Sequence, residues 1–138
     1  MFDSPFERKI KKLASESGLK IADLKASGAK FLFNVRGHTQ PLFVVPYGET
    51  WELSCPTIVA LDALDDFPQF ILAIALKDNS TNKRGFWCIE KIGGKEVLEY
   101  MHNIPEASLT ADEFYKSCRI IVEQVEKLED AFRQALRL

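Results

Sequence analysis

The sequence predicts an α+β fold in which an antiparallel sheet packs against helices. An amphipathic helical pattern stands at each end of the chain, and runs of neighbouring strand-like segments lie between them. Short polar turns join these segments, which favours antiparallel pairing. The expected order is helix, three strands, helix, two strands, helix, in one domain that spans residues 1–138.

The first predicted helix follows Ser4, which suits the N-cap position. Pro5 fits the first helical position, and Glu7 stands where a capping box requires it. Gly18 offers the left-handed residue that commonly ends a helix. The helix has one apolar stripe at helical spacing, formed by Phe6, Ile10, Leu13 and Ala14.

Three strand-like segments follow the first helix. Residues 31–36 alternate apolar and polar side chains with a period of two, which is typical of a half-buried strand. Residues 42–45 are more uniformly apolar. Residues 51–55 alternate again, and Pro56 predicts a strand edge or a bulge before a continuation over residues 57–61.

The apolar segment 67–76 fits a helix or a short buried strand. Pro68, the preceding Asp65 and Asp66, and the alanine content favour the helix. Its sides are apolar all round, so we expect neighbours to cover more than one face. The residues that exceed what one sheet can cover are candidates for a subunit or client contact, with burial inside the monomer as the alternative: Phe67, Phe70 and Ile74.

Residues 86–92 and 97–104 are expected to form a hairpin, because the two glycines between them tolerate a tight turn. Cys88 and His102 then lie on neighbouring strands, so a Cys–His pair is conceivable. A nucleophilic thiol also needs a lowered pKa and an orienting third group, which the sequence does not specify. Packing roles are therefore the preferred interpretation of both residues.

The final helix has the strongest pattern. Thr110 and Glu113 fit a capping box ahead of a seven-residue apolar repeat. Tyr115, Val122 and Leu136 widen the apolar stripe, which favours an amphipathic helix laid across the sheet over coiled-coil pairing. The repeat consists of Phe114, Cys118, Ile121, Val125, Leu128, Phe132 and Ala135.

Composition and motifs argue against several functions. The net charge of −2 gives no strong field for nucleic acid or anionic lipid. No apolar run approaches the ~20 residues of a membrane helix, and the N-terminus lacks a signal-peptide pattern, so we expect a cytoplasmic protein. No nucleotide loop, catalytic motif or metal-ligand spacing occurs, which predicts a non-enzyme without cofactor or metal. Three widely spaced cysteines do not predict disulfides: Cys55, Cys88 and Cys118.

Two polar sites have simple interpretations at this level. His38 is expected in a hairpin turn, where polar residues are common. The adjacent carboxylates Glu129 and Asp130 lie in a polar context on the final helix and are expected to face solvent.

Besides the element order, four features of the chain carry a family resemblance. They are the paired strands at residues 31–35 and 42–45, the helix end at 76–79, the hairpin from 86–89 to 100–105, and the helix entry at 109–114. In these features the chain resembles the YbjN-like family, bacterial proteins described as sensory transduction regulators that share the type III secretion chaperone-like fold. The resemblance implies an α-β-β-β-α-β-β-α domain, a protein-binding role and often a homodimer.

We therefore expect a non-enzymatic, chaperone-like or regulatory module that binds a protein partner or peptide segment and forms a homodimer. The alternative is a small-ligand sensor or an unfamiliar enzyme with a pocket between the sheet and the final helix. Cys88, Tyr100 and His102 would then lie at the rim. A deep pocket with converging polar groups would favour the alternative, and an apolar patch repeated across a two-fold axis would favour the module.

Overall fold

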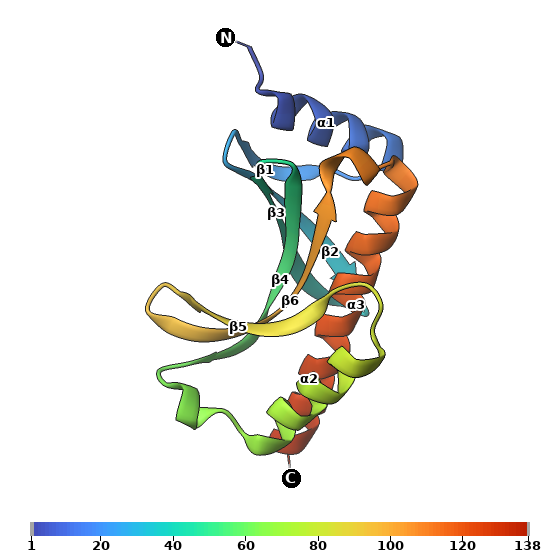
Figure 1. Ribbon diagram of the computed structural model, residues 1–138. Coiled ribbons are helices and arrows are strands. Elements are labelled where there is room, and N and C mark those ends of the chain that lie inside the picture. The colour runs from blue at the N-terminus through green and yellow to red at the C-terminus, as the bar shows by residue number, and fades with distance from the viewer. Residues whose placement is uncertain (1, 138) are drawn as a thin grey trace.

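In the computed structural model, which describes residues 2–137, a six-stranded antiparallel sheet carries three helices on one side (Figure 1). The strand order is β1-β2-β3-β4-β6-β5, so β1 and β5 form the edges. The predicted α+β class is confirmed. The elements are α1 (Pro5–Ser17), β1 (Ile21–Lys25), β2 (Gly28–Val35), β3 (His38–Tyr47), β4 (Thr50–Leu61), α2 (Gln69–Thr81), β5 (Phe86–Ile92), β6 (Lys95–Pro105) and α3 (Ala111–Leu136).

Four strands precede α2, where the sequence predicted three. The additional strand, β1, pairs antiparallel with β2 and is irregular between Ile21 and Asp23. None of its five residues is buried, so its apolar pattern is too weak to mark a strand. The predicted bulge in β4 is confirmed, since its register with β6 shifts between Pro56 and Ala60 while the strand continues to Leu61.

Helix α1 forms as its sequence predicts. Ser4 Oγ accepts a hydrogen bond from the Glu7 backbone at 3.1 Å, and the Ser4 N–H donates to the Glu7 carboxylate at 3.0 Å. Gly18 ends the helix in the left-handed region with φ 69°. All four residues of the predicted stripe are buried.

Helix α3 crosses the sheet over β2, β3, β4 and β6, and Figure 1 shows it beside the full height of these strands. Only half of its predicted capping box forms. Thr110 Oγ1 accepts from the Glu113 N–H at 3.1 Å, but the Glu113 carboxylate pairs with Arg84 at 3.1 Å. The apolar repeat is buried as far as Leu128, whereas Tyr115 and Leu136 are exposed.

Alternation along the strands gives the sheet a helix-covered face and a helix-free face. The helix-covered face holds the core, where Phe31 meets Phe114 of α3 edge to face at 5.7 Å between ring centroids. Among residues 2–137, no helix covers the other face (Figure 1). Ser54, Glu99 and Met101 are nevertheless buried there, next to their register partners Phe43, Cys88 and Phe86.

The three cysteines are unpaired, as the sequence predicts: Cys55, Cys88 and Cys118. Within the described residues, no helix combines the length and apolarity that a membrane crossing requires.

Candidate functional site

Helix α2 is a helix, as favoured from the sequence, and it begins after Pro68, which occupies the N-cap. The expectation that neighbours cover more than one of its faces is wrong. Only Ile71 and Ala75 are buried, because the helix packs on one side against β5 and α3. The opposite side of the helix, which is apolar throughout residues 70–76, therefore faces solvent.

The three predicted contact residues lie in different environments. Phe67 is 6% exposed and belongs to the core, so it cannot contribute to a contact surface in this conformation. Phe70 is 41% exposed, and Ile74 is half-buried against the core. The sequence interpretation missed Leu76, which is 71% exposed and is the most exposed large apolar residue of the helix.

A mostly apolar hollow of about 320 Å³ lies between α2 and β5, and we call it the α2–β5 groove. Leu72, Ala75 and Leu76 line it from the helix. Its other lining residues are Asn79 of α2, Trp87, Cys88 and Ile89 of β5, and Leu98 of β6.

The free edge of β5 runs beside this groove, and Asn79 closes part of it. The Trp87 N–H donates to Asn79 Oδ1 at 2.6 Å, and Asn79 Nδ2 donates to the Trp87 carbonyl at 3.1 Å. Backbone groups alternate in direction along an antiparallel strand, so those of Ile89 and Lys91 also point away from β6. Among the hydrogen bonds of the described chain, none satisfies these groups. The edge of β5 that follows Trp87 along the chain is therefore open to pairing with another strand.

The conceivable Cys88–His102 pair does not form. Cys88 lies opposite Glu99 and faces the helix-free side, whereas His102 lies opposite Leu53 and faces the helices. Burial, and then the nearby Arg84 charge, lower the pKa of His102. Tyr100 is fully buried and donates to the Arg84 carbonyl at 2.6 Å. These residues form no common rim, so nothing in their placement supports the predicted ligand pocket.

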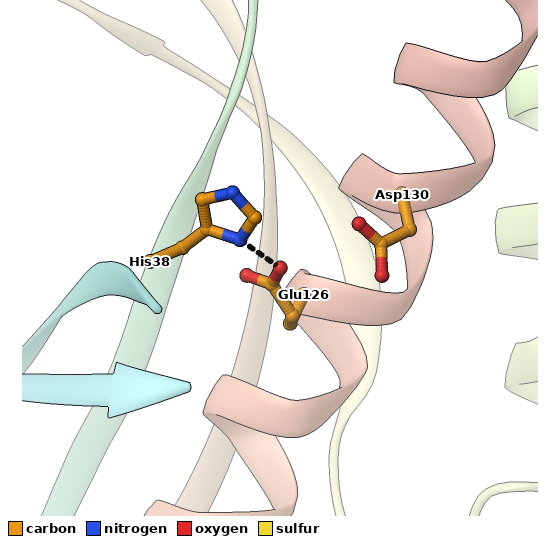
Figure 2. A group of neighbouring side chains, drawn as sticks. All are labelled: His38, Glu126 and Asp130. Atoms are coloured by element: carbon orange, nitrogen blue, oxygen red, sulfur yellow. Dashed lines mark hydrogen bonds and ion pairs between the residues drawn. The ribbon is translucent and has the colours of Figure 1, made fainter. Parts of the chain in front are cut away.

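A partly buried polar network, which we call the His38 cluster, joins α3 to the start of β3. It contains His38, Gln40, Glu126, Glu129, Asp130 and Arg133. Figure 2 shows the His38 ring directed at the Glu126 carboxylate, with Asp130 one helical turn further along. The expectation that Glu129 faces solvent is wrong, since Glu129 is 3% exposed and Glu126 is fully buried.

Hydrogen bonds to protein donors stabilise both buried carboxylates of this cluster. Gln40 Nε2 lies 2.7 Å from oxygens of both Glu126 and Glu129, and the Ile58 N–H donates to Glu129 at 2.8 Å. Arg133 Nη2 lies 3.0 Å from Glu126 and 2.7 Å from Asp130. These hydrogen bonds and ion pairs offset the free-energy cost of burying the carboxylates.

The His38 cluster offers one nitrogen and two carboxylates close enough for a metal ion. The guanidinium of Arg133 already provides the cation, and its Nη2 also lies 3.4 Å from His38 Nδ1. The arrangement therefore fits a structural clasp between α3 and the sheet. Asp130 and Glu129 precede Arg133 by three and four residues, and this spacing was a sequence signal for their ion pairs but not for the burial of Glu129.

A second acidic group, the Glu99 cluster, lies on the helix-free face and contains buried Glu99, half-buried Cys88 and exposed Glu90. One ligand atom from each lies within 4.8 Å of the others. Glu99 is 3% exposed. Its burial, and then the neighbouring Glu90 charge, raise the pKa of Glu99 to about 7. Burial, and then Glu99, raise the pKa of the Cys88 thiol to about 12.

No protein-family model matches the chain, and no curated protein does. Solved structures match it closely in architecture. A chain of the HopA1–SchA chaperone–effector complex superposes with a TM-score of 0.66 at 12% identity, covering 91% of this chain and 93% of that one. A chain of the ExsC–ExsE complex gives 0.61 at 17% identity, with coverage of 89% and 92%.

YbjN from E. coli, described as a candidate transcription regulator, gives a TM-score of 0.62 at 12% identity over 94% of both chains. The chain has the type III secretion chaperone-like fold. The fold that the resemblance implied is thus confirmed. At these identities the likeness concerns the fold alone, so function is argued from the surfaces described above.

Proposed function

We propose that this chain is a non-enzymatic protein-binding module with a chaperone-like or regulatory role, and that it forms a homodimer through the α2–β5 groove. The observation that carries the proposal is the apolar groove beside an open strand edge. Such an edge binds an added strand through its backbone, while pockets beside it bind side chains.

A second copy of the chain suits this surface. In a two-fold dimer the same patch meets itself, so it must offer both a protrusion and a recess. Phe70 and Leu76 of α2 provide exposed apolar side chains, and the groove provides the recess. Antiparallel pairing of two β5 strands at Ile89 and Lys91 would extend the sheet across the dimer.

The fold neighbours support the protein-binding part of the proposal, since two of them are complexes of two proteins, one named a chaperone–effector complex. The third is described as a candidate regulator. Three unpaired thiols suit a reducing bacterial cytoplasm.

Light scattering of the purified chain across protein concentration tests the dimer. We expect a dimer that Phe70→Asp and Leu76→Asp separately convert to monomers, because each buries a charge in an apolar contact. Lys77→Asp, at an exposed position of the same helix, is the matched control and should stay dimeric. Circular dichroism establishes that each variant is folded. A chain that remains monomeric at every concentration would contradict the homodimer.

A further inference from the structure

The Glu99 cluster holds negative charge without a cation. Glu52 adds a third carboxylate, and its negative charge contributes to raising the pKa of Glu99. Among the ion pairs of the described residues, none involves Glu52, Glu90 or Glu99. Glu99 is almost wholly buried, and its side-chain contacts, with the weak Cys88 thiol at 3.8 Å and with Glu90, stay inside the cluster.

The His38 cluster shows how this protein normally accommodates such charge. There, two buried carboxylates receive hydrogen bonds from an amide, a backbone N–H and an arginine. Burying a carboxylate without such partners is costly. The negative charge of the Glu99 cluster is therefore not balanced within the chain. This is the property expected of a site to which another molecule supplies the cation.

Apolar side chains flank this charge on the helix-free face. Phe86 lies two residues before Cys88 on β5 and is 37% exposed, and Ile92 lies two residues after Glu90 and is 44% exposed. Lys30 shows that the face accommodates an ammonium group, since its Nζ lies 5.7 Å from the centre of the Phe43 ring. Exposed apolar patches that border polar residues are typical of protein-binding surfaces.

We propose that the helix-free face binds a partner protein segment that places a lysine or arginine side chain, flanked by apolar residues, against Glu90 and Glu99. This inference rests on the proposed protein-binding function and specifies the chemistry of the partner. The basic group would pair with the buried carboxylate, and its apolar neighbours would cover Phe86. The segment would occupy the face opposite the helices and leave the α2–β5 groove free for the dimer.

A divalent metal is the competing occupant, since a thiolate and two carboxylates can bind one. A metal would have to displace the proton of a thiol whose pKa is raised to about 12. It would also leave the surrounding apolar surface uncovered. A basic side chain needs no deprotonation of Cys88. It would pair with the carboxylates, and its apolar neighbours would cover the apolar surface beside them.

A random decapeptide array with the fluorescently labelled protein tests the proposal. We expect bound peptides to be enriched in lysine or arginine next to apolar residues. The highest-affinity peptide is then resynthesised and measured by calorimetry. Glu99→Gln and Glu90→Gln should each weaken its binding at least tenfold, because each removes a partner of a desolvated charge. Higher salt should weaken wild-type binding as well.

Glu96→Gln is the matched control, because Glu96 lies on the same strand but on the opposite face, and it should leave binding unchanged. Enrichment without basic residues, or equal binding by all variants, would overturn the inference. So would Co²⁺ binding with a thiolate charge-transfer band that Cys88→Ser abolishes. If one of these results is found and light scattering still shows a dimer, the homodimer proposal stands. Failure of this inference is therefore distinguishable from failure of the homodimer.

Discussion

Two acidic clusters, each with a buried carboxylate, lie on opposite faces of one sheet and differ in the partners that their buried carboxylates have. In the His38 cluster, Glu126 and Glu129 receive donors from β3, β4 and α3, including the guanidinium of Arg133. In the Glu99 cluster, the described chain supplies only other acids and a thiol. The first cluster is thus complete within the monomer, and the second is not.

The contrast teaches that burial alone does not assign a role to a carboxylate. A buried acid with its hydrogen bonds satisfied holds elements together, and its loss leaves donors unpaired. A buried acid without them weakens the free protein and gains from a ligand. Removing the buried carboxylate should therefore have opposite effects on stability at the two sites.

Glu126→Ala should have the largest effect. It leaves His38, Gln40 and Arg133 without their shared acceptor in the interior, so we expect a loss of about 3–5 kcal/mol in the free energy of unfolding. Urea unfolding followed by tryptophan fluorescence measures it. Glu123→Ala is the control, because Glu123 is 41% exposed and its ion pairs should contribute about 1 kcal/mol or less. A Glu126→Ala variant as stable as the control would refute the clasp.

Glu99→Gln should act in the opposite direction. A raised pKa means that the folded carboxyl binds its proton more tightly than the unfolded one, so wild-type stability falls as pH rises from about 4.5 through about 7. At pH 8 the substitution should stabilise the protein by about 1–3 kcal/mol. This stabilisation should disappear below about pH 4.5, where Glu99 of the wild type is protonated in both the folded and the unfolded state.

Urea unfolding of wild type and Glu99→Gln at pH 4, 6 and 8 measures this dependence. Glu96→Gln on the same strand controls for the loss of one negative charge. A destabilised Glu99→Gln protein at pH 8 would show that Glu99 is satisfied in the monomer and would remove the contrast between the clusters.

Arg133→Gln should cost less than Glu126→Ala, at about 1–2 kcal/mol, because the arginine is 25% exposed and water can partly replace it. The hydrogen bond from Arg133 also makes the largest contribution to lowering the pKa of Asp130. The substitution should therefore move the carboxyl titration of Asp130 toward its ordinary value in NMR. Arg119→Gln, which removes only an exposed pair with Glu123, is the control. An unchanged Asp130 titration would contradict the pairing.

The sequence predicted those parts of the fold whose signals are local. The caps at Ser4 and Gly18, the two-glycine turn and the apolar repeat of α3 each depend on neighbouring residues, and each forms. Strand β1 could not be predicted, because its two half-buried residues, Ile21 and Leu24, are three positions apart and so lack the period of two that marks a strand. It is recognisable only through its pairing with β2.

The interior acids required long-range information. Glu126 and Glu129 follow apolar residues of the α3 stripe, and residue type alone places carboxylates outside. They are buried because Gln40, some 86 positions earlier, lies beside them. The separation of Cys88 from His102 was predictable. The two-residue turn pairs Ile92 with Lys95, which places Cys88 opposite Glu99 and on the other face from His102.

The reactivity of Cys88 gives the smallest and most local test of the contrast. Burial, and then Glu99, raise the pKa of this thiol to about 12, so alkylation by iodoacetamide at pH 8 should be slow. Glu99→Gln removes the nearest charge and should speed alkylation several-fold, whereas Glu96→Gln should not. Mass spectrometry of the peptide that contains Cys88 measures the rate separately from the buried Cys55 and Cys118. Equal rates in wild type and Glu99→Gln would mean that burial alone suppresses the thiol, and that Glu99 carries no charge to offer a basic partner.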